Sequence, residues 1–186
     1  MAKSDSQTQF DAPVVWASPP SGGEPWAFSV LPRDASAVLP RRGRTSVHGH
    51  INGVAFSARL EPDGQRSHWL RSDQDLIETA ALSPGPACMA HFSIQPLDPE
   101  PEPQVPADLH AALQASPEAL RVWQDTSTLA RVDWIHWVES AKQTKTRDKR
   151  IRDACDMLSE GKRRVCCFDP SGVYSQALSA PKPADA

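Results

Sequence analysis

The sequence is short of long apolar runs. No segment of its 186 residues reaches the roughly 18 consecutive apolar residues of a transmembrane helix. Residues 1–23 are polar and contain no apolar core of the length that a signal peptide has. These two absences argue against a helical membrane protein and predict a cytoplasmic location.

Cysteine is also scarce. The chain has too few cysteines, too unevenly spaced, for the disulfide framework of a small secreted domain: Cys88, Cys155, Cys166 and Cys167. The adjacent Cys166 and Cys167 could form a vicinal disulfide. The neighbouring Arg163 and Arg164 favour the reactive thiolate. We interpret the pair as ordinary thiols that anchor Phe168 and keep a thiol-redox or metal-binding role as an alternative.

Several catalytic motifs are missing. The sequence has no GxSxG elbow, no phosphate-cradling glycine loop, no dinucleotide fingerprint and no Cys/His spacing typical of zinc. Hydrolase, kinase and dehydrogenase activities therefore have no support. We expect a protein that is not an enzyme and that needs no cofactor.

The chain has no overall excess of positive charge. Its net charge is −3, which argues against a protein that coats nucleic acid, because such binding neutralises several phosphates at once. The average conceals a local excess, since residues 142–164 hold nine basic and four acidic residues, a difference of +5. The basic residues are Lys142, Lys145, Arg147, Lys149, Arg150, Arg152, Lys162, Arg163 and Arg164.

Glycine is outnumbered by proline, nine to eighteen, and the prolines cluster where elements end. Residues 97–106 contain four prolines and three acidic residues without periodicity, as an extended linker does. A chain of this length allows two small domains. The predicted organisation is a disordered N-terminus (1–25), a β-domain (26–96), a Pro-rich acidic linker (97–106), a helical domain (107–162) and a flexible tail (163–186).

The clearest local pattern is a β-hairpin in residues 46–60. Asn52 and Gly53 lie between two alternating segments, as a two-residue type I′ turn requires. Such a turn dictates the register of the two strands. The predicted facing pairs are Ile51 with Val54, His50 with Ala55, Gly49 with Phe56, His48 with Ser57, and Val47 with Ala58.

Other patterns complete an α+β prediction. Alternation predicts further strands at 26–31, 68–71 and 88–94, and Ser72 with Asp75 resembles the capping box of a short helix. Beyond the linker the period becomes helical, with one apolar face at Leu129, Val132, Ile135 and Val138 and another at Ile151, Cys155 and Leu158. Asp108 and Ser116 are placed to cap two helices, and Gly161 is placed to end the last one.

These residues resemble two bacterial families. The stretch from Val47 to Phe56, the phrase Leu60-Glu61-Pro62-Asp63-Gly64 and the Pro106-Ala107-Asp108-Leu109 entry are similar to the bacterial domain of unknown function 1905. The later pattern is similar to the YdeI/OmpD-associated helical domain, also labelled bacteriocin-protection. It consists of Trp134-Ile135, Ala141-Lys142, Thr146-Arg147, Arg150-Ile151, Leu158 and Gly161.

The resemblance implies a small N-terminal β-barrel of the double-split type, followed by a short C-terminal helical bundle. It implies no catalytic residue. The double-split barrel is distantly similar to swapped-hairpin transcription factors, and the bacteriocin-protection label concerns antimicrobial peptides at the cell envelope.

Two histidines are the candidate metal ligands. His48 and His50 project from one face of a predicted strand, a spacing that metal sites on sheets use. No third ligand is evident: His68 and His91 are residues of a suitable type, but nothing in the sequence brings them close. We favour two partly exposed histidines on the polar face of the hairpin and predict no metal.

The basic stretch supplies the candidate binding residues. Arg147 falls on the side of a helix that faces the core, so it requires a carboxylate, and Asp133 and Glu139 are the candidates. An anion- or partner-binding surface is the functional interpretation, and a solvated face is the alternative. The residues concerned are Lys142, Lys145, Arg147, Lys149, Arg150 and Arg152. Much of the charge of Lys142, Lys145, Lys149 and Arg152 should face outward.

The leading hypothesis is a non-enzymatic binding or stress-protection protein whose partner is a protein, a peptide or an anionic ligand. A nucleic-acid-binding regulator is an alternative, although nucleic acid is not the favoured partner. The tryptophans near the basic stretch, Trp123, Trp134 and Trp137, suggest stacking on bases. Core packing is the better account for most of them.

Overall fold

The computed structural model describes residues 7–18, 23–165 and 178–184. It divides into two compact units, one formed by the described residues up to Pro99 together with 178–184, the other by residues 100–165. The division falls inside the Pro-rich segment 97–106. Each unit has a hydrophobic core of its own.

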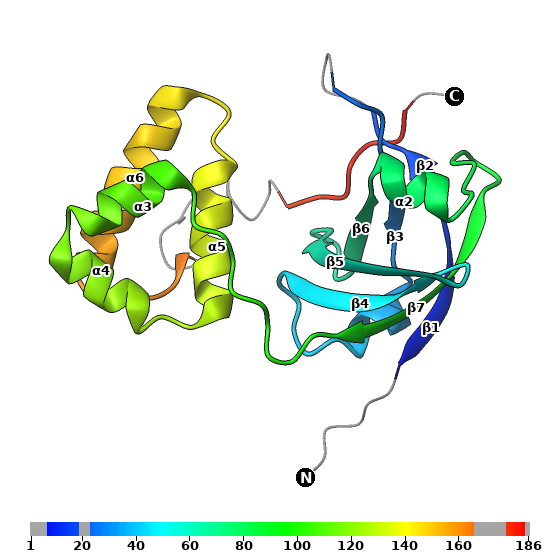
Figure 1. Cartoon of the computed structure of the whole chain (residues 1–186), viewed down its shortest axis with the longest axis horizontal. Coiled ribbons are helices and arrows are strands. Elements are labelled where there is room, and N and C mark those ends of the chain that lie inside the picture. Colours follow the sequence, from blue (N-terminus) through cyan, green and yellow to red (C-terminus); the bar gives the residue numbers. More distant parts are fainter. Residues whose placement is uncertain (1–6, 19–22, 166–177, 185–186) are drawn as a thin grey trace, which may run out of the picture. The chain divides into compact units, whose positions relative to one another are not determined.

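The first unit is a nearly closed antiparallel barrel of seven strands (Figure 1). The strands follow the order β1-β7-β4-β5-β6-β3-β2. Their bounds are β1 Thr8–Pro13, β2 Val15–Trp16, β3 Ala27–Val30, β4 Thr45–Ile51, β5 Val54–Pro62, β6 His68–Ser72 and β7 Met89–Pro96. Two short helices belong to the same unit, α1 Arg33–Ala37 and α2 Gln74–Thr79. This barrel confirms the predicted β-part of the α+β fold.

The barrel curls because two continuous segments, β5 and β1 with β2, each pair with one strand along their first part and with a different strand along their last part. β5 pairs with β4 through residues 54–60 and with β6 through Glu61 and Pro62. In the same way β1 pairs with β7, and β2, separated from β1 only by Val14, pairs with β3. Strands that change partners along their length form the corners of small barrels.

The hairpin has the predicted register. All five predicted pairs are observed between β4 and β5, from Ile51 with Val54 to Val47 with Ala58. Asn52 and Gly53 have φ values of 49° and 85°, as a type I′ turn demands. The turn is also joined to β7, because the Asn52 Oδ1 accepts a hydrogen bond from the His91 N–H at 2.9 Å.

The prediction that residues 1–25 are disordered is wrong for β1 and β2. β1 forms an antiparallel ladder with β7, and Phe10 stacks on Phe92 with ring centroids 5.1 Å apart. Ala12 and Val14 are buried in the barrel core. The polar composition of the N-terminal region hid a period-2 pattern in which Phe10, Ala12 and Val14 alternate with polar residues or proline.

Part of the predicted flexible tail is also ordered. Within residues 178–184, Pro183 forms an antiparallel bridge with Ala17, immediately after β2. In Figure 1 this segment is drawn in red beside the label of β2. The tail prediction rested on small residues and prolines, which are compatible with an extended edge segment as well as with disorder.

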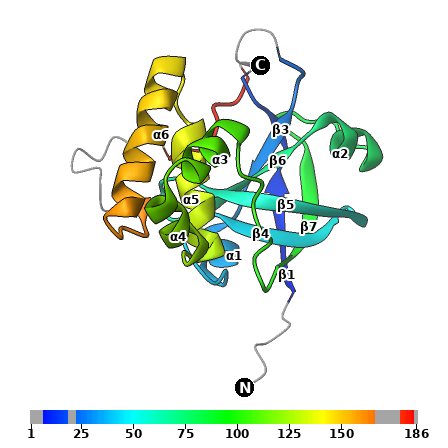
Figure 2. The same ribbon diagram turned by 60° about the vertical axis from the view of Figure 1, so that its left-hand side comes forward.

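The second unit is a bundle of four helices (Figure 2). They are α3 Ala107–Gln114, α4 Pro117–Gln124, α5 Thr128–Glu139 and α6 Thr144–Ser159. α6 packs against each of the other three. Trp134 and Leu158, both fully buried, lie in the core with Leu109 and Val138. The predicted C-terminal helical bundle is confirmed.

Four helix boundaries test the expected caps. Ser116 is the N-cap residue of α4 with Pro117 at its first turn, as predicted, and Gly161 follows α6 with φ of 83°. The cap of α2 is Asp73 instead of Ser72, because the Asp73 carboxylate accepts a hydrogen bond from the Leu76 N–H. Asp108 does not cap α3, whose N-cap residue is Pro106.

Candidate functional site

The exposed cations at the start of α6 form the candidate binding surface. Lys145, Lys149 and Arg152 are spaced i, i+4 and i+7, which places them on one side of the helix. Lys142 precedes them by one turn, and all four residues are exposed. We call Lys142, Lys145, Lys149 and Arg152 the α6 cation surface.

Three members of this surface have no ionic partner among the described residues: Lys142, Lys145 and Arg152. Lys149 differs, since its Nζ lies 2.6 Å from the Asp153 carboxylate one turn later. Both side chains of that pair are accessible to solvent, so the ion pair is weak and leaves Lys149 able to exchange partners.

Arg147 has a structural partner, but not the predicted one. Its Nε and Nη2 donate to the two carboxylate oxygens of Asp108 on α3, at 2.6 and 2.9 Å. This bidentate hydrogen bond lowers the pKa of Asp108 and raises that of Arg147. The prediction of Asp133 or Glu139 is wrong because α6 packs against α3 as well as α5, a choice that the sequence does not reveal.

Arg150 donates hydrogen bonds to groups at the C-terminal end of α5. Its Nη1 donates to the Trp137 carbonyl at 2.5 Å and to the Ser140 Oγ at 2.8 Å. The guanidinium also lies over the Trp137 ring, 5.4 Å from the centroid. A cation at the C-terminus of a helix satisfies carbonyls that have no partner within the helix, so Arg150 stabilises the bundle.

The six predicted binding residues therefore differ in their surroundings. Arg147 and Arg150 make contacts inside the bundle, and Lys149 has an acidic neighbour on its own helix. Lys142, Lys145 and Arg152 are directed to solvent. Sequence periodicity suggested which cations face outward, but the contacts of Arg150 depended on tertiary structure.

Tryptophans of the bundle serve mainly as core. Trp134 is fully buried, and its Nε1 donates to the Arg163 carbonyl at 3.3 Å. Trp137 meets it edge to face at 5.9 Å and is half-buried. Trp123 is 6 % exposed. Core packing is thus confirmed for Trp123 and Trp134.

His48 and His50 lie side by side in an open hollow of the barrel surface. The hollow has a volume of about 530 Å³, and Gln7 and Gln95 also line it. In the described part of the chain, no three His, Cys, Asp or Glu residues lie close enough to hold a metal ion. The other candidate histidine ligands are engaged elsewhere, since His91 pairs with Asp11 and His68 is buried.

The thiol hypothesis concerns residues that are not described. Cys166 and Cys167 both lie outside the described residues. Cys88 and Cys155 are free thiols, and burial raises the pKa of the Cys155 thiol. A raised pKa disfavours the reactive thiolate, so Cys155 is a packing residue of the bundle.

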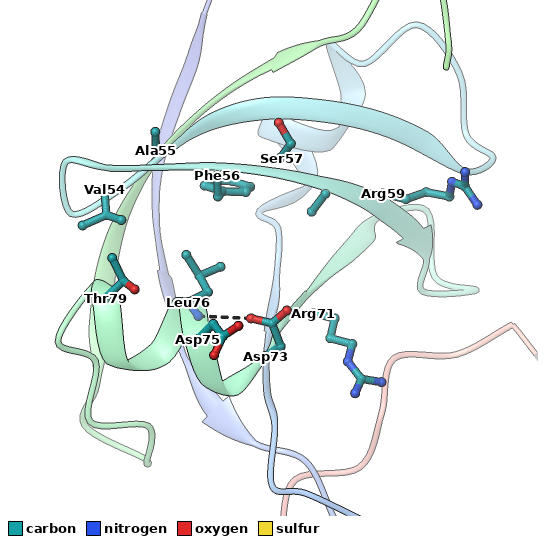
Figure 3. Close-up of a pocket in the computed structure, with 11 residues that line it drawn as sticks. Val54, Ala55, Phe56, Ser57, Arg59, Arg71, Asp73, Asp75, Leu76 and Thr79 are labelled. Carbon is teal, nitrogen blue, oxygen red and sulfur yellow. Dashed lines mark hydrogen bonds between the residues drawn. The ribbon is translucent and has the colours of Figure 1, made fainter. Parts of the chain in front are cut away.

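The sequence did not suggest the hollow between β5 and α2, which has a volume of about 490 Å³ (Figure 3). Phe56 and Leu76 supply apolar surface, while Arg59, Arg71 and Asp75 supply charge. The Arg71 guanidinium also lies 4.4 Å from the centre of the Trp26 ring. The mixture suits a ligand that is part apolar and part charged. Alternation along β5 was visible in the sequence, but the nearness of α2 was not.

The fold and the surface define a two-domain α+β protein, and the comparisons agree with this division. Residues 10–91 match the Domain of unknown function (DUF1905), and residues 102–161 match the family Bacteriocin-protection, YdeI or OmpD-Associated. The two matches agree with the two-domain organisation: the barrel unit is similar to the DUF1905 domain and the helical unit that follows is similar to the YdeI or OmpD-associated domain. This confirms the resemblance. The first match begins inside β1, upstream of the expected boundary at residue 26.

A comparison with curated proteins gives no match. Among the described residues, no helix is long and apolar enough to span a membrane. The family description refers to bacteriocin protection and names no ligand, so the chemistry of a partner has to be inferred from this chain's own residues.

Proposed function

We propose that this protein is a non-enzymatic binding protein of the bacteriocin-protection type and that its α6 cation surface recognises an acidic protein or peptide. The observation that carries the proposal is the exposure of Lys142, Lys145 and Arg152 without an ionic partner among the described residues. The family description supports a protective role.

The surface is chemically suited to an anionic partner. The ammonium groups of Lys142 and Lys145 are compact, strongly hydrated charges, and the planar guanidinium of Arg152 binds a carboxylate through two hydrogen bonds. Because these charges are exposed, they attract an acidic partner from a distance and so raise the association rate and, with it, the association constant. Binding should therefore be sensitive to salt.

The rest of α6 is suited to hold this surface in place. Arg147 connects α6 to α3, and Arg150 connects it to the end of α5. These contacts place the surface on a rigid helix, which lowers the entropy lost when a partner binds. We infer a cytoplasmic location, with which the free thiols Cys88 and Cys155 are compatible.

The test is affinity capture from a bacterial lysate with the full chain and quantification of bound proteins. Replacement of Lys142, Lys145 and Arg152 by glutamine should lower recovery of the partner about tenfold or more, equivalent to at least about 1.4 kcal/mol. A matched control removes three exposed arginines of the barrel unit, Arg33, Arg42 and Arg66, and should leave recovery unchanged.

Both triple variants have the same net charge, so a general charge effect would lower their recoveries equally and would contradict the proposal. Equal recovery by the wild type and the α6 variant would also contradict it. Nuclease treatment of the lysate separates the alternative function: loss of the captured material after this treatment would indicate a nucleic-acid-binding regulator instead.

A further inference from the structure

The C-terminal segment 178–184 lies on the open edge of β2. The Ala184 N–H donates to the Trp16 carbonyl at 2.8 Å, and the Ser18 N–H donates to the Lys182 carbonyl at 2.9 Å. These two bonds flank the bridge between Ala17 and Pro183. The segment thus pairs with the barrel as a short antiparallel strand would.

The prolines of the segment match this pairing. In an antiparallel pair, successive residues direct their N–H and C=O groups alternately toward the partner strand and away from it. Lys182 and Ala184 direct theirs toward β2, so the alternation assigns Pro181 and Pro183 to positions whose N–H would point away. Proline has no N–H, so both prolines fit without loss of a hydrogen bond. The spacing Pro-x-Pro therefore places both prolines where the edge of β2 requires no N–H donor.

The segment contributes no fully buried residue. In the described part of the chain, none of residues 178–184 belongs to the barrel core or packs against it as a partly buried hydrophobic residue. The segment also approaches Gly64, where an added Cβ would lie 2.0 Å from the Leu178 carbonyl oxygen. Release of the segment therefore removes no residue of the barrel core.

β2 itself would stay in place after release. Its opposite edge pairs with β3, and the Ala17 N–H donates to the Trp26 carbonyl at 2.9 Å. Release would leave the Ser18 N–H and the Trp16 carbonyl without partners at an exposed edge. Such an edge is a template for pairing with another extended chain.

We propose that this edge of the barrel is a peptide-binding site for extended segments with the pattern Pro-x-Pro, occupied in the free protein by the chain's own residues 178–184. A segment of the same pattern from a partner protein displaces them. The proposal is independent of the α6 cation surface, because the edge belongs to the barrel unit.

The first test measures fluorescence anisotropy of a labelled peptide of residues 178–184, Leu-Ser-Ala-Pro-Lys-Pro-Ala. It should bind saturably to a variant that ends at residue 177. Binding to the full chain should be at least about tenfold weaker, because the tethered segment competes at a high effective concentration. A control peptide of the same composition, Leu-Ser-Ala-Lys-Pro-Ala-Pro, moves each proline by one position and should not bind, since it lacks the N–H equivalent to that of Ala184.

The second test keeps the chain at full length. Gly64→Asn adds a Cβ against the Leu178 carbonyl, and asparagine tolerates the positive φ of this position, 73°. Hydrogen exchange at the Ser18 amide should accelerate, while the Ala17 amide, which donates to the Trp26 carbonyl, stays protected. The matched control is Gly53→Asn, at a φ of 85° with nothing within 4 Å of the added Cβ, and it should leave both amides unchanged.

Three outcomes would overturn the proposal. One is equal binding of the two peptides, and another is a Ser18 amide that remains protected in the Gly64→Asn variant. The third is a dimer of the full chain that dissociates into monomers on truncation, because the segment would then be an arm that pairs with a second copy. A truncated chain that fails to fold leaves the Gly64 comparison as the deciding measurement.

Discussion

At the scale of single residues, His68 connects three parts of the barrel. It is 1 % exposed, its Nδ1 lies 2.7 Å from the Ser36 Oγ of α1, and its Nε2 lies 2.9 Å from the Gly43 carbonyl oxygen. A carbonyl can only accept, so Nε2 donates to Gly43. Nδ1 then accepts from the Ser36 hydroxyl. The hydrogen bond from the Ser36 hydroxyl requires the neutral ring, because a protonated Nδ1 could not accept, whereas Nε2 donates to Gly43 in either protonation state.

A pH dependence of stability follows from this arrangement. Burial lowers the pKa of His68 below the ordinary value of 6.5. The unfolded chain therefore takes up a proton at higher pH than the folded chain, so the free energy of unfolding decreases as the pH falls below about 6.5. Urea unfolding at a series of pH values measures the effect.

His68→Gln should be less stable than the wild type at neutral pH and should lose part of this slope on the acid side. His50→Gln, which changes an exposed histidine on β4, should keep the full slope. A His68→Gln variant with the wild-type slope would contradict the role assigned to His68.

At the scale of elements, Gly49 allows β4 to lie between β5 and β7. It faces Phe56 on one side and Ile94 on the other. A Cβ at this position would lie 1.8 Å from the Ser93 carbonyl oxygen, which is backbone and cannot rotate away. The ladder between β4 and β7 would have to separate to admit any other residue.

We therefore expect Gly49→Ala to lower the free energy of unfolding by about 3 kcal/mol or more, the upper part of the range for overpacking. Gly43→Ala is the control, since an added Cβ there has nothing within 4 Å, and it should change the stability by about 0.5 kcal/mol or less. Chemical denaturation of both variants makes the comparison, and similar losses in the two would show that space at Gly49 is not limiting.

Local sequence patterns predicted some of the elements and missed others. Asn52-Gly53 and the alternation around it predicted every pair of the hairpin, because turn type determines register. β1 was missed, since its partner β7 is about eighty residues away and a polar edge strand resembles a disordered terminus until that partner is known. Period alone predicted most of the apolar faces of α5 and α6, since all of the expected residues are buried except Leu129.

At the scale of the whole molecule, sequence predicted two parts with distinct periods and placed the division between them near residues 97–106. It did not predict that residues 100–106 join the helical unit, where the Glu102 carboxylate accepts from Arg131 at 2.7 Å. Nor did it predict that residues 178–184 return to the barrel. Both features depend on pairing between distant segments, which composition does not encode.

The same limit applies to the candidate site. Spacing along α6 was enough to identify Lys142, Lys145, Lys149 and Arg152 as outward cations, but not to show that Lys149 pairs with Asp153. The partner of Arg147 required knowledge that α3 packs on α6, and the hollow beside α2 required the curvature of β5. Local charge patterns therefore predict a surface better than they predict a pocket.

The most direct test of the central claim, that the α6 cation surface binds an acidic partner, is the salt dependence of that affinity. The association constant of the captured partner, measured by titration calorimetry, should fall as salt rises in the wild type and change much less in the variant without Lys142, Lys145 and Arg152. Equal salt dependence in the two proteins would contradict the claim.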